Sequence, residues 1–107
     1  MSKTIQFAVA LAAVVLIAGA VGFAQSSGEA IYKAKCQSCH GAEGTPNPGI
    51  AKMMGVKPLS DPSVKSLSEA QMIADTTNGK GKMPAFKGKL TDAQIKDSVA
   101  YFRTFAK

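Results

Sequence analysis

Hydrophobic residues are unevenly distributed along the chain, and the longest apolar run lies near its start. Residues 7–24 contain no charged side chain, and Lys3 is the only charge before them. A short basic start, an apolar run and small residues up to Ala24 are typical of a cleaved signal peptide. We therefore predict a signal peptide over residues 1–24 and one exported domain, periplasmic or in another exported compartment, over residues 25–107. An uncleaved membrane anchor is the alternative, because the run approaches the about 20 apolar residues that span a bilayer.

Three later stretches have the pattern of amphipathic helices. Ser26 and Glu29 have the spacing of a capping box, which predicts a helix running to about Cys36. A second helix is predicted over residues 68–77, where apolar residues gather on one side and an Asn-Gly pair follows as a stop signal.

The last helix is predicted to begin at Thr91, with Gln94 again at capping-box spacing. Its apolar positions recur at helical intervals and are Ile95, Val99, Phe102 and Ala106. We expect Lys96, Asp97 and Arg103 to face away from the core. No segment alternates at period two, so the sequence predicts an all-α domain.

Between the first two helices, residues 41–62 are dense in glycine and proline. This density argues against long regular elements, although residues 50–54 are compatible with one short turn of helix. A long irregular segment inside a small domain is typical of chain that wraps around something. Because the domain has few large apolar side chains, a bulky apolar group inside it would help it to fold.

The composition excludes several kinds of chemistry. The 107 residues include one His, two Cys and no Trp, with a formal net charge of +6. One His cannot form a multi-histidine metal site, and two Cys do not complete a structural zinc site. No nucleophile with a catalytic partner is evident, and no nucleic-acid-binding motif accompanies the positive charge. We therefore expect neither an enzyme of these classes nor a nucleic-acid-binding protein.

The two cysteines and the histidine form the motif C-x-x-C-H at Cys36, Cys39 and His40, which is typical of c-type heme attachment. Thiols one helical turn apart can each form a thioether with a porphyrin vinyl group, and the adjacent imidazole can bind the iron. The alternatives are a redox dithiol, a structural disulfide and a zinc site completed by a carboxylate. The first lacks the βαβ context of such motifs, and the third lacks enough Cys and His ligands.

A second protein ligand to the iron would define an electron carrier rather than an open binding site. Because the single His is already used, the candidates are Met53, Met54, Met72 and Met83. Met72 is explained as core filling on a helix, and the pair at 53–54 as wall residues. Met83 lies in a glycine-containing loop before a proline, where the backbone can approach a ligand closely. We predict that Met83 is the second axial ligand.

These motifs resemble those of a known family. The segment Cys36–His40, the loop Asn78–Phe86 with sequence NGKGKMPAF, a following Gly-Lys-Leu and the final helix with Ala100-Tyr101 are similar to class I monoheme cytochromes c. Within that class the chain most resembles the small carriers of the cytochrome c6 type. The resemblance implies a small cytochrome c fold, with three to four helices and loops around one covalently bound heme c.

The family pattern also implies a crossing of the first and last helices, with Gly28 and Tyr32 near Tyr101. Ser98 stands where the family often has a large apolar residue, which predicts a looser crossing. A proline carbonyl should accept the proton on the other nitrogen of the His ligand. Pro46 and Pro48 are both candidates, with a slight preference for Pro48.

The resemblance implies a one-electron carrier, and not an enzyme, that acts between exported or membrane-bound redox partners. The basic residues flanking Met83 are Lys80, Lys82, Lys87 and Lys89. They form either a positive rim that steers the protein to an acidic partner or a solvated loop. We expect a monomer that is membrane-associated only if residues 1–24 stay uncleaved. The rival functions are a heme enzyme or sensor with an open sixth position, and a disulfide-stapled binding module.

Overall fold

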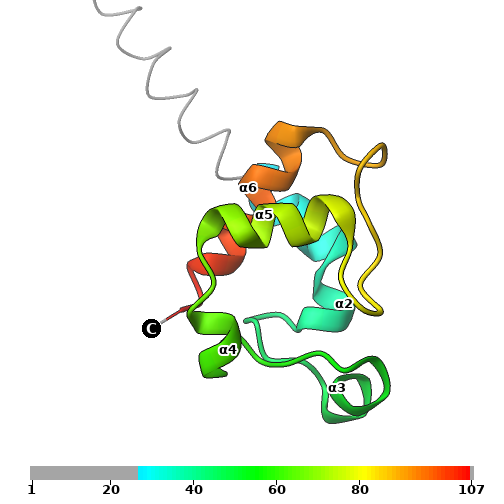
Figure 1. Cartoon of the computed structure of the whole chain (residues 1–107), viewed down its shortest axis with the longest axis vertical. Coiled ribbons are helices and arrows are strands. Elements are labelled where there is room, and N and C mark those ends of the chain that lie inside the picture. Colours follow the sequence, from blue (N-terminus) through cyan, green and yellow to red (C-terminus); the bar gives the residue numbers. More distant parts are fainter. Residues whose placement is uncertain (1–26, 107) are drawn as a thin grey trace, which may run out of the picture.

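The computed structural model describes residues 27–106 (Figure 1). A first helix covers residues 27–35, and a turn at Cys36 separates it from α2 (Gln37–His40). The other helices are α3 (Pro48–Met54), α4 (Pro62–Lys65), α5 (Glu69–Asn78) and α6 (Asp92–Arg103). Within the described residues there are no strands, only two isolated β-bridges between residues 80 and 90. The all-α prediction is confirmed, whereas the predicted signal peptide and Ser26 lie outside the described residues.

Helices α5 and α6 begin where the sequence predicts, because each carries a complete capping box. The Gln71 backbone N–H donates to the Ser68 hydroxyl at 3.1 Å, and the Ser68 N–H donates to the Gln71 side chain at 2.9 Å. Thr91 and Gln94 make the same pair of bonds at the same two distances. Such reciprocal caps satisfy amides that a helix start leaves free. Helix α5 ends at Gly79, where a φ of 80° stops the helix.

The short helices α3 and α4 show why the proline-rich region is more regular than its composition predicts. Each begins with a proline in its first turn, Pro48 or Pro62, and each is capped by the preceding side chain, Asn47 or Asp61. Proline is favoured at a helix start, because its missing N–H would have no partner there. The described helices therefore exceed the three to four that we expected, through short segments. Helix α3 contains the turn predicted at 50–54, whereas α4 was not predicted.

The first helix crosses α6 closely. A Cβ atom added to Gly28 would lie 2.5 Å from the carbonyl oxygen of Asp97, so only glycine fits there. One turn later, the Tyr32 and Tyr101 rings lie 5.4 Å apart between centroids. Ser98, where we expected a looser crossing, is buried, and its hydroxyl donates to the Ile95 carbonyl at 2.8 Å. The predicted crossing is present, and at Gly28 the two backbones are in close contact.

The end of α6 differs from the prediction. The helix stops at Arg103, and Ala106 lies beyond it and is exposed, so Ala106 does not extend the apolar face. Arg103 does not face away from the core, because it is partly buried and its guanidinium reaches the segment that leads into α5. Helix periodicity placed Arg103 opposite the apolar stripe, but its long side chain bends back across the protein.

The core lies where α5 and α6 pack together in the upper half of Figure 1. Its buried side chains are Leu59, Met72, Phe86, Ile95 and Val99. The loop after α5 is tied to that helix, since the Phe86 N–H donates to the Thr76 carbonyl at 3.0 Å. None of the described helices is long and apolar enough to cross a membrane. The core is small, and several of its residues also face the site described next.

Candidate heme site

The C-x-x-C-H residues are placed by the junction of the first helix and α2. The Cys36 N–H donates to the Tyr32 carbonyl at 2.9 Å, and the His40 N–H donates to the Cys36 carbonyl at 3.0 Å. The backbone thus keeps an almost helical path, which puts the two thiols one turn apart. Cys36, Cys39 and His40 all line one cavity of about 860 Å³. The structure therefore brings together the three residues that the motif predicted.

The walls of this cavity, called here the heme cavity, are mainly apolar. Among the apolar side chains that line it are Val64, Leu67, Met72, Phe86, Val99 and Phe102. They come from α4, α5, α6 and the loops between them. Protein interiors are normally packed with few voids larger than a water molecule. A cavity of this size in so small a domain is therefore a binding site for a large apolar group.

Met83 reaches the same cavity from the loop after α5. The Lys80 and Met83 backbones exchange two hydrogen bonds, of 3.2 and 3.0 Å, around a tight turn. Gly81 in this turn has a φ of 58°, and Gly79 before it has a φ of 80°. A Cβ on Gly79 would lie 2.9 Å from the Met83 carbonyl oxygen. The glycines thus permit the close backbone approach that the sequence predicted for this loop.

The other methionines fall into two groups. The prediction of Met53 as a wall residue is wrong, because Met53 is 64% exposed and does not line the cavity. Met54 and Met72 do line it. The Met72 sulfur lies 3.7 Å from an Arg103 nitrogen that donates to it, and the residue belongs to the buried core, as predicted. Met83 combines a place in the cavity with an irregular loop and only partial burial.

His40 is electrostatically suited to bind a metal. Burial lowers the pKa of its imidazole from the usual value, which favours the neutral ring that metals bind. The ring packs edge-on against Phe102, with centroids 5.4 Å apart. Of the two candidate prolines, Pro46 is buried and Pro48 is exposed at the start of α3. The slight preference for Pro48 as the partner of His40 stays a prediction.

The cysteines do not have the character of a redox dithiol. Both are free thiols, and burial, followed by the nearby Cys39, raises the pKa of Cys36 to about 11. Redox-active C-x-x-C pairs instead have a lowered thiol pKa. In residues 27–106 no group of three His, Cys, Asp or Glu side chains is arranged to hold a metal ion. The donor set and the apolar walls fit a covalently held heme.

Lysines gather where the cavity opens. Those that line it, called here the rim lysines, are Lys35, Lys52, Lys57, Lys80 and Lys82. Sequence reasoning found two of them from their closeness to Met83. It missed Lys35, Lys52 and Lys57, because they are distant from Met83 in the sequence and no local pattern marks them. Lys87 and Lys89, which were also proposed, are exposed but do not line the cavity.

The rim also contains specific contacts. The Lys82 Nζ donates to the Met53 carbonyl oxygen at 2.7 Å and so connects the methionine loop to the end of α3. Lys80 lies 3.8 Å from the Asp75 carboxylate, which is a cavity residue as well. The charge at the opening is therefore mostly positive, with one carboxylate among the lysines.

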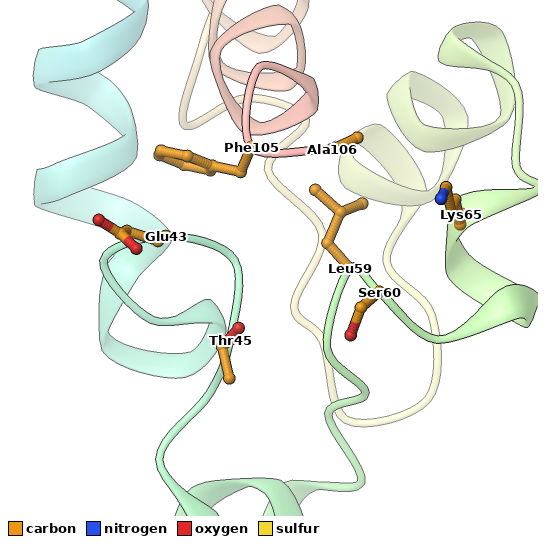
Figure 2. Close-up of a pocket in the computed structure, with 7 residues that line it drawn as sticks. All are labelled: Glu43, Thr45, Leu59, Ser60, Lys65, Phe105 and Ala106. Atoms are coloured by element: carbon orange, nitrogen blue, oxygen red, sulfur yellow. The ribbon is translucent and has the colours of Figure 1, made fainter.

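A second, smaller hollow of about 160 Å³ lies near the end of the described chain (Figure 2). Its residues are Glu43, Thr45, Leu59, Ser60, Lys65, Phe105 and Ala106. Figure 2 shows the Leu59 side chain pointing toward Phe105 and Ala106. None of the predicted heme ligands takes part in it. The chemistry of the protein therefore belongs to the larger cavity.

Helices wrapped around an apolar cavity that is lined by a C-x-x-C-H segment define the class of small c-type cytochromes. A family model described as "Cytochrome C oxidase, cbb3-type, subunit III" matches residues 23–102. The chain therefore belongs to this family of c-type cytochromes.

Individual relatives agree with that assignment. The cytochrome c6 of Leptolyngbya boryana is 36% identical over 80 residues, which cover 71% of this chain and 86% of the relative. The cytochrome c6 of a Picosynechococcus species is 32% identical over 114 residues, covering 94% and 92%. A solved structure, the KustC0563 c-type cytochrome, has a TM-score of 0.67 at 29% identity and covers 75% of this chain and 98% of its own.

These findings confirm the resemblance to class I monoheme cytochromes c close to cytochrome c6. They also confirm the predicted fold, the cofactor and the kind of function. The protein is a one-electron carrier with one covalently bound heme c.

Proposed function

We propose that Cys36 and Cys39 would hold the heme of this carrier through thioether bonds, and that His40 and Met83 would bind its iron. The observation that supports this most strongly is that all four side chains line one apolar cavity, although Met83 comes from a distant loop. The thiols and His40 come from one helical junction, and Met83 from a tight turn held by its own backbone.

The heme supplies a single electron site, and the chain determines how readily that site is reduced. A methionine sulfur as second ligand raises the reduction potential relative to a second histidine. The apolar walls act in the same direction, because the oxidised form carries one more positive charge and a dry interior disfavours it. Two protein ligands leave no open position, so we propose a carrier and not a catalyst.

We further propose that the protein docks acidic redox partners with the rim lysines. These side chains lie where the heme cavity opens, so a partner held there would be close to the cofactor. Long-range attraction speeds such encounters, while exposed charges allow rapid release. Docking of this kind depends on the lysine charges, which gives a direct test. Electron-transfer rates with an acidic partner should fall steeply as ionic strength rises. A rate that is independent of salt would contradict the proposal.

The site of action we propose is an exported compartment, the periplasm or its equivalent. The support is the basic start and uncharged run of residues 1–24. Mass spectrometry of protein matured in a heme-attaching host distinguishes the two fates of this segment. Cleavage would give the mass of residues 25–107 plus one heme, and we expect that form to be a monomer. If the segment stays as an anchor, the protein would keep its full mass and partition with membranes.

Absorption spectra of the purified protein in both redox states test the ligation. Wild type should be low-spin, with the long-wavelength band of methionine-ligated oxidised heme. Met83→Ala should lose that band, open the iron to carbon monoxide and stay covalently bound to heme. Met72→Leu and Met54→Leu are the matched controls, since both residues line the cavity.

Two results would contradict the ligand assignment. A wild-type protein that is high-spin and binds carbon monoxide readily would favour a sensor or enzyme. Loss of the methionine band in Met54→Leu or Met72→Leu, and not in Met83→Ala, would move the ligand to another methionine.

A further inference from the structure

Arg103 links the end of α6 to the wall of the heme cavity. Its Nη1 donates to the Leu67 carbonyl oxygen at 3.1 Å and to the Met72 sulfur at 3.7 Å. Figure 1 shows the red end of α6 beside the green segment that leads from α4 into α5. Leu67 and Met72 both line the heme cavity, whereas Arg103 does not. The guanidinium therefore contacts two residues of the cavity wall without lining the cavity itself.

In the part of the chain that the structure describes, Arg103 forms no ion pair with a carboxylate. Ion pairs found there join Lys33 to Glu29 and Lys80 to Asp75. The partners of Arg103 are instead a carbonyl oxygen and a thioether, neither of which is an anion. An arginine stays protonated at all physiological pH values. A permanent, partly buried cation is therefore held against the cofactor site by two directed contacts.

We propose that Arg103 is a positioning residue whose fixed charge raises the reduction potential of the heme. The oxidised form carries one more positive charge than the reduced form, so a nearby cation destabilises the oxidised form more. Partial burial matters, because salt screens such a charge much less than it screens an exposed lysine. The inference depends on the proposed function only in that the heme fills this cavity.

Redox titrations of the mature holoprotein, at low and high salt, test the proposal with three variants. Arg103→Gln removes the charge, and Arg103→Lys keeps it. Lys96→Gln removes one charge from an exposed position of the same helix and is the matched control. At the ambient potential where wild type is half reduced, Arg103→Gln should lower the ratio of reduced to oxidised protein by about two- to tenfold. Arg103→Lys should stay within twofold of wild type.

Salt separates a charge effect from a structural one. The difference between Arg103→Gln and wild type should persist at high salt, whereas any difference caused by Lys96→Gln should disappear. If Arg103→Lys lowers the ratio as much as Arg103→Gln does, Arg103 is only a structural clamp and the proposal is wrong. The proposal is also wrong if neither Arg103 variant changes the ratio of reduced to oxidised protein.

Spectra recorded on the same samples keep this test independent of the ligand assignment. Unchanged methionine-ligation bands in all three variants show that any potential shift does not come from a lost ligand. If Arg103→Gln loses those bands, its potential reports ligand loss, and the electrostatic proposal is overturned. A failure of the proposed function would instead appear in wild type itself, as absent heme or a different spin state.

Discussion

The two segments that supply the proposed heme ligands are held by different kinds of contact. The attachment segment, residues 27–40, carries the C-x-x-C-H motif and is packed into the protein. Gly28 lies against the α6 backbone, and Tyr32 is only 1% exposed. Around Tyr32, the rings of Tyr101, Phe102 and Phe105 have centroids within 5.9 Å of its own. The close packing fixes the position of this segment.

The methionine loop, residues 79–86, depends on fewer and more exposed contacts. A tight turn, the Lys82 bond to Met53, the Lys80–Asp75 ion pair and the bond from Phe86 to the end of α5 hold it, and among its side chains Phe86 is buried in the core. Regions with few buried contacts open locally before the rest of a protein unfolds. If the proposed ligands are correct, we expect the attachment segment to determine whether the heme is kept and the methionine loop to determine how its potential is tuned.

The largest effect should follow removal of the attachment thiols. The double variant Cys36→Ala/Cys39→Ala should contain no covalent heme, because no thioether can form. Met83→Ala should keep its heme covalently bound and lose only the second ligand. Extraction with acidified organic solvent followed by intact-mass analysis measures this difference. Equal heme loss from both variants would contradict the division of roles between the two segments.

The attachment segment should also give the protein a distinct alkaline limit. Burial raises the pKa of Tyr32 from 10.0 to about 12, and its hydroxyl donates to the Gly41 carbonyl at 2.6 Å. The folded protein therefore keeps a proton that the unfolded chain loses above pH 10. The free energy of unfolding should be unaffected by this group below pH 10 and should fall by about 1.4 kcal/mol per pH unit up to pH 12.

The control for this pH effect is Tyr32→Phe, which has no proton to lose. At neutral pH it should cost about 1 kcal/mol for the lost hydrogen bond. Guanidinium denaturation at several alkaline pH values should show a steeper loss of stability in wild type than in Tyr32→Phe. Parallel pH profiles for the two proteins would show that Tyr32 does not titrate in this way.

The methionine loop is best probed through its glycines. Gly79→Ala places a Cβ 2.9 Å from the Met83 carbonyl oxygen at a φ of 80°. Gly81 has a φ of 58° with no atom near its Cβ position, so Gly81→Ala isolates the cost of the backbone conformation. We expect Gly81→Ala to lower the free energy of unfolding by about 1 kcal/mol and Gly79→Ala by about 2 kcal/mol.

Only Gly79→Ala should also weaken the methionine-ligation band, because its clash falls on the backbone of the ligand itself. Denaturation curves and oxidised-state spectra of both variants measure the two effects separately. Equal spectra with equal destabilisation would show that the methionine loop tolerates displacement of its backbone.

The sequence predicted those features of the two segments that depend on residues close together in the chain. The attachment motif and the glycines around Met83 act within a few residues, and the structure brings these segments to one cavity. The capping boxes of α5 and α6 are local as well, and those helix starts were predicted correctly. Short-range patterns therefore selected residues that the fold brings to one cavity.

What the sequence did not predict depends on contacts between distant segments. Arg103 was assigned to the exposed face by helical periodicity, but its partner carbonyl lies 36 residues away. Lys35, Lys52 and Lys57 reach the cavity opening only through the folded chain. Helix α4 was missed for another reason, because Pro62 was taken as a breaker and stands at a helix start.

The smallest predicted effect concerns the bond that connects the methionine loop to α3. Lys82→Gln removes the ammonium that donates to the Met53 carbonyl oxygen. The bond is exposed, so we expect a loss of only about 0.5 kcal/mol, which corresponds to roughly a twofold change in an equilibrium. Added imidazole should displace the methionine ligand at about half the concentration needed for wild type. A spectral titration measures this displacement.

Lys87→Gln is the control, since it removes the same charge from an exposed residue of the neighbouring segment that does not line the cavity. It should need the same imidazole concentration as wild type. If Lys82→Gln and Lys87→Gln shift the titration equally, the effect comes from general charge and not from the bond to Met53. The methionine loop would then be held without help from Lys82, by its backbone turn and the bond from Phe86 to α5, and the contrast with the packed attachment segment would be larger than the contacts indicate.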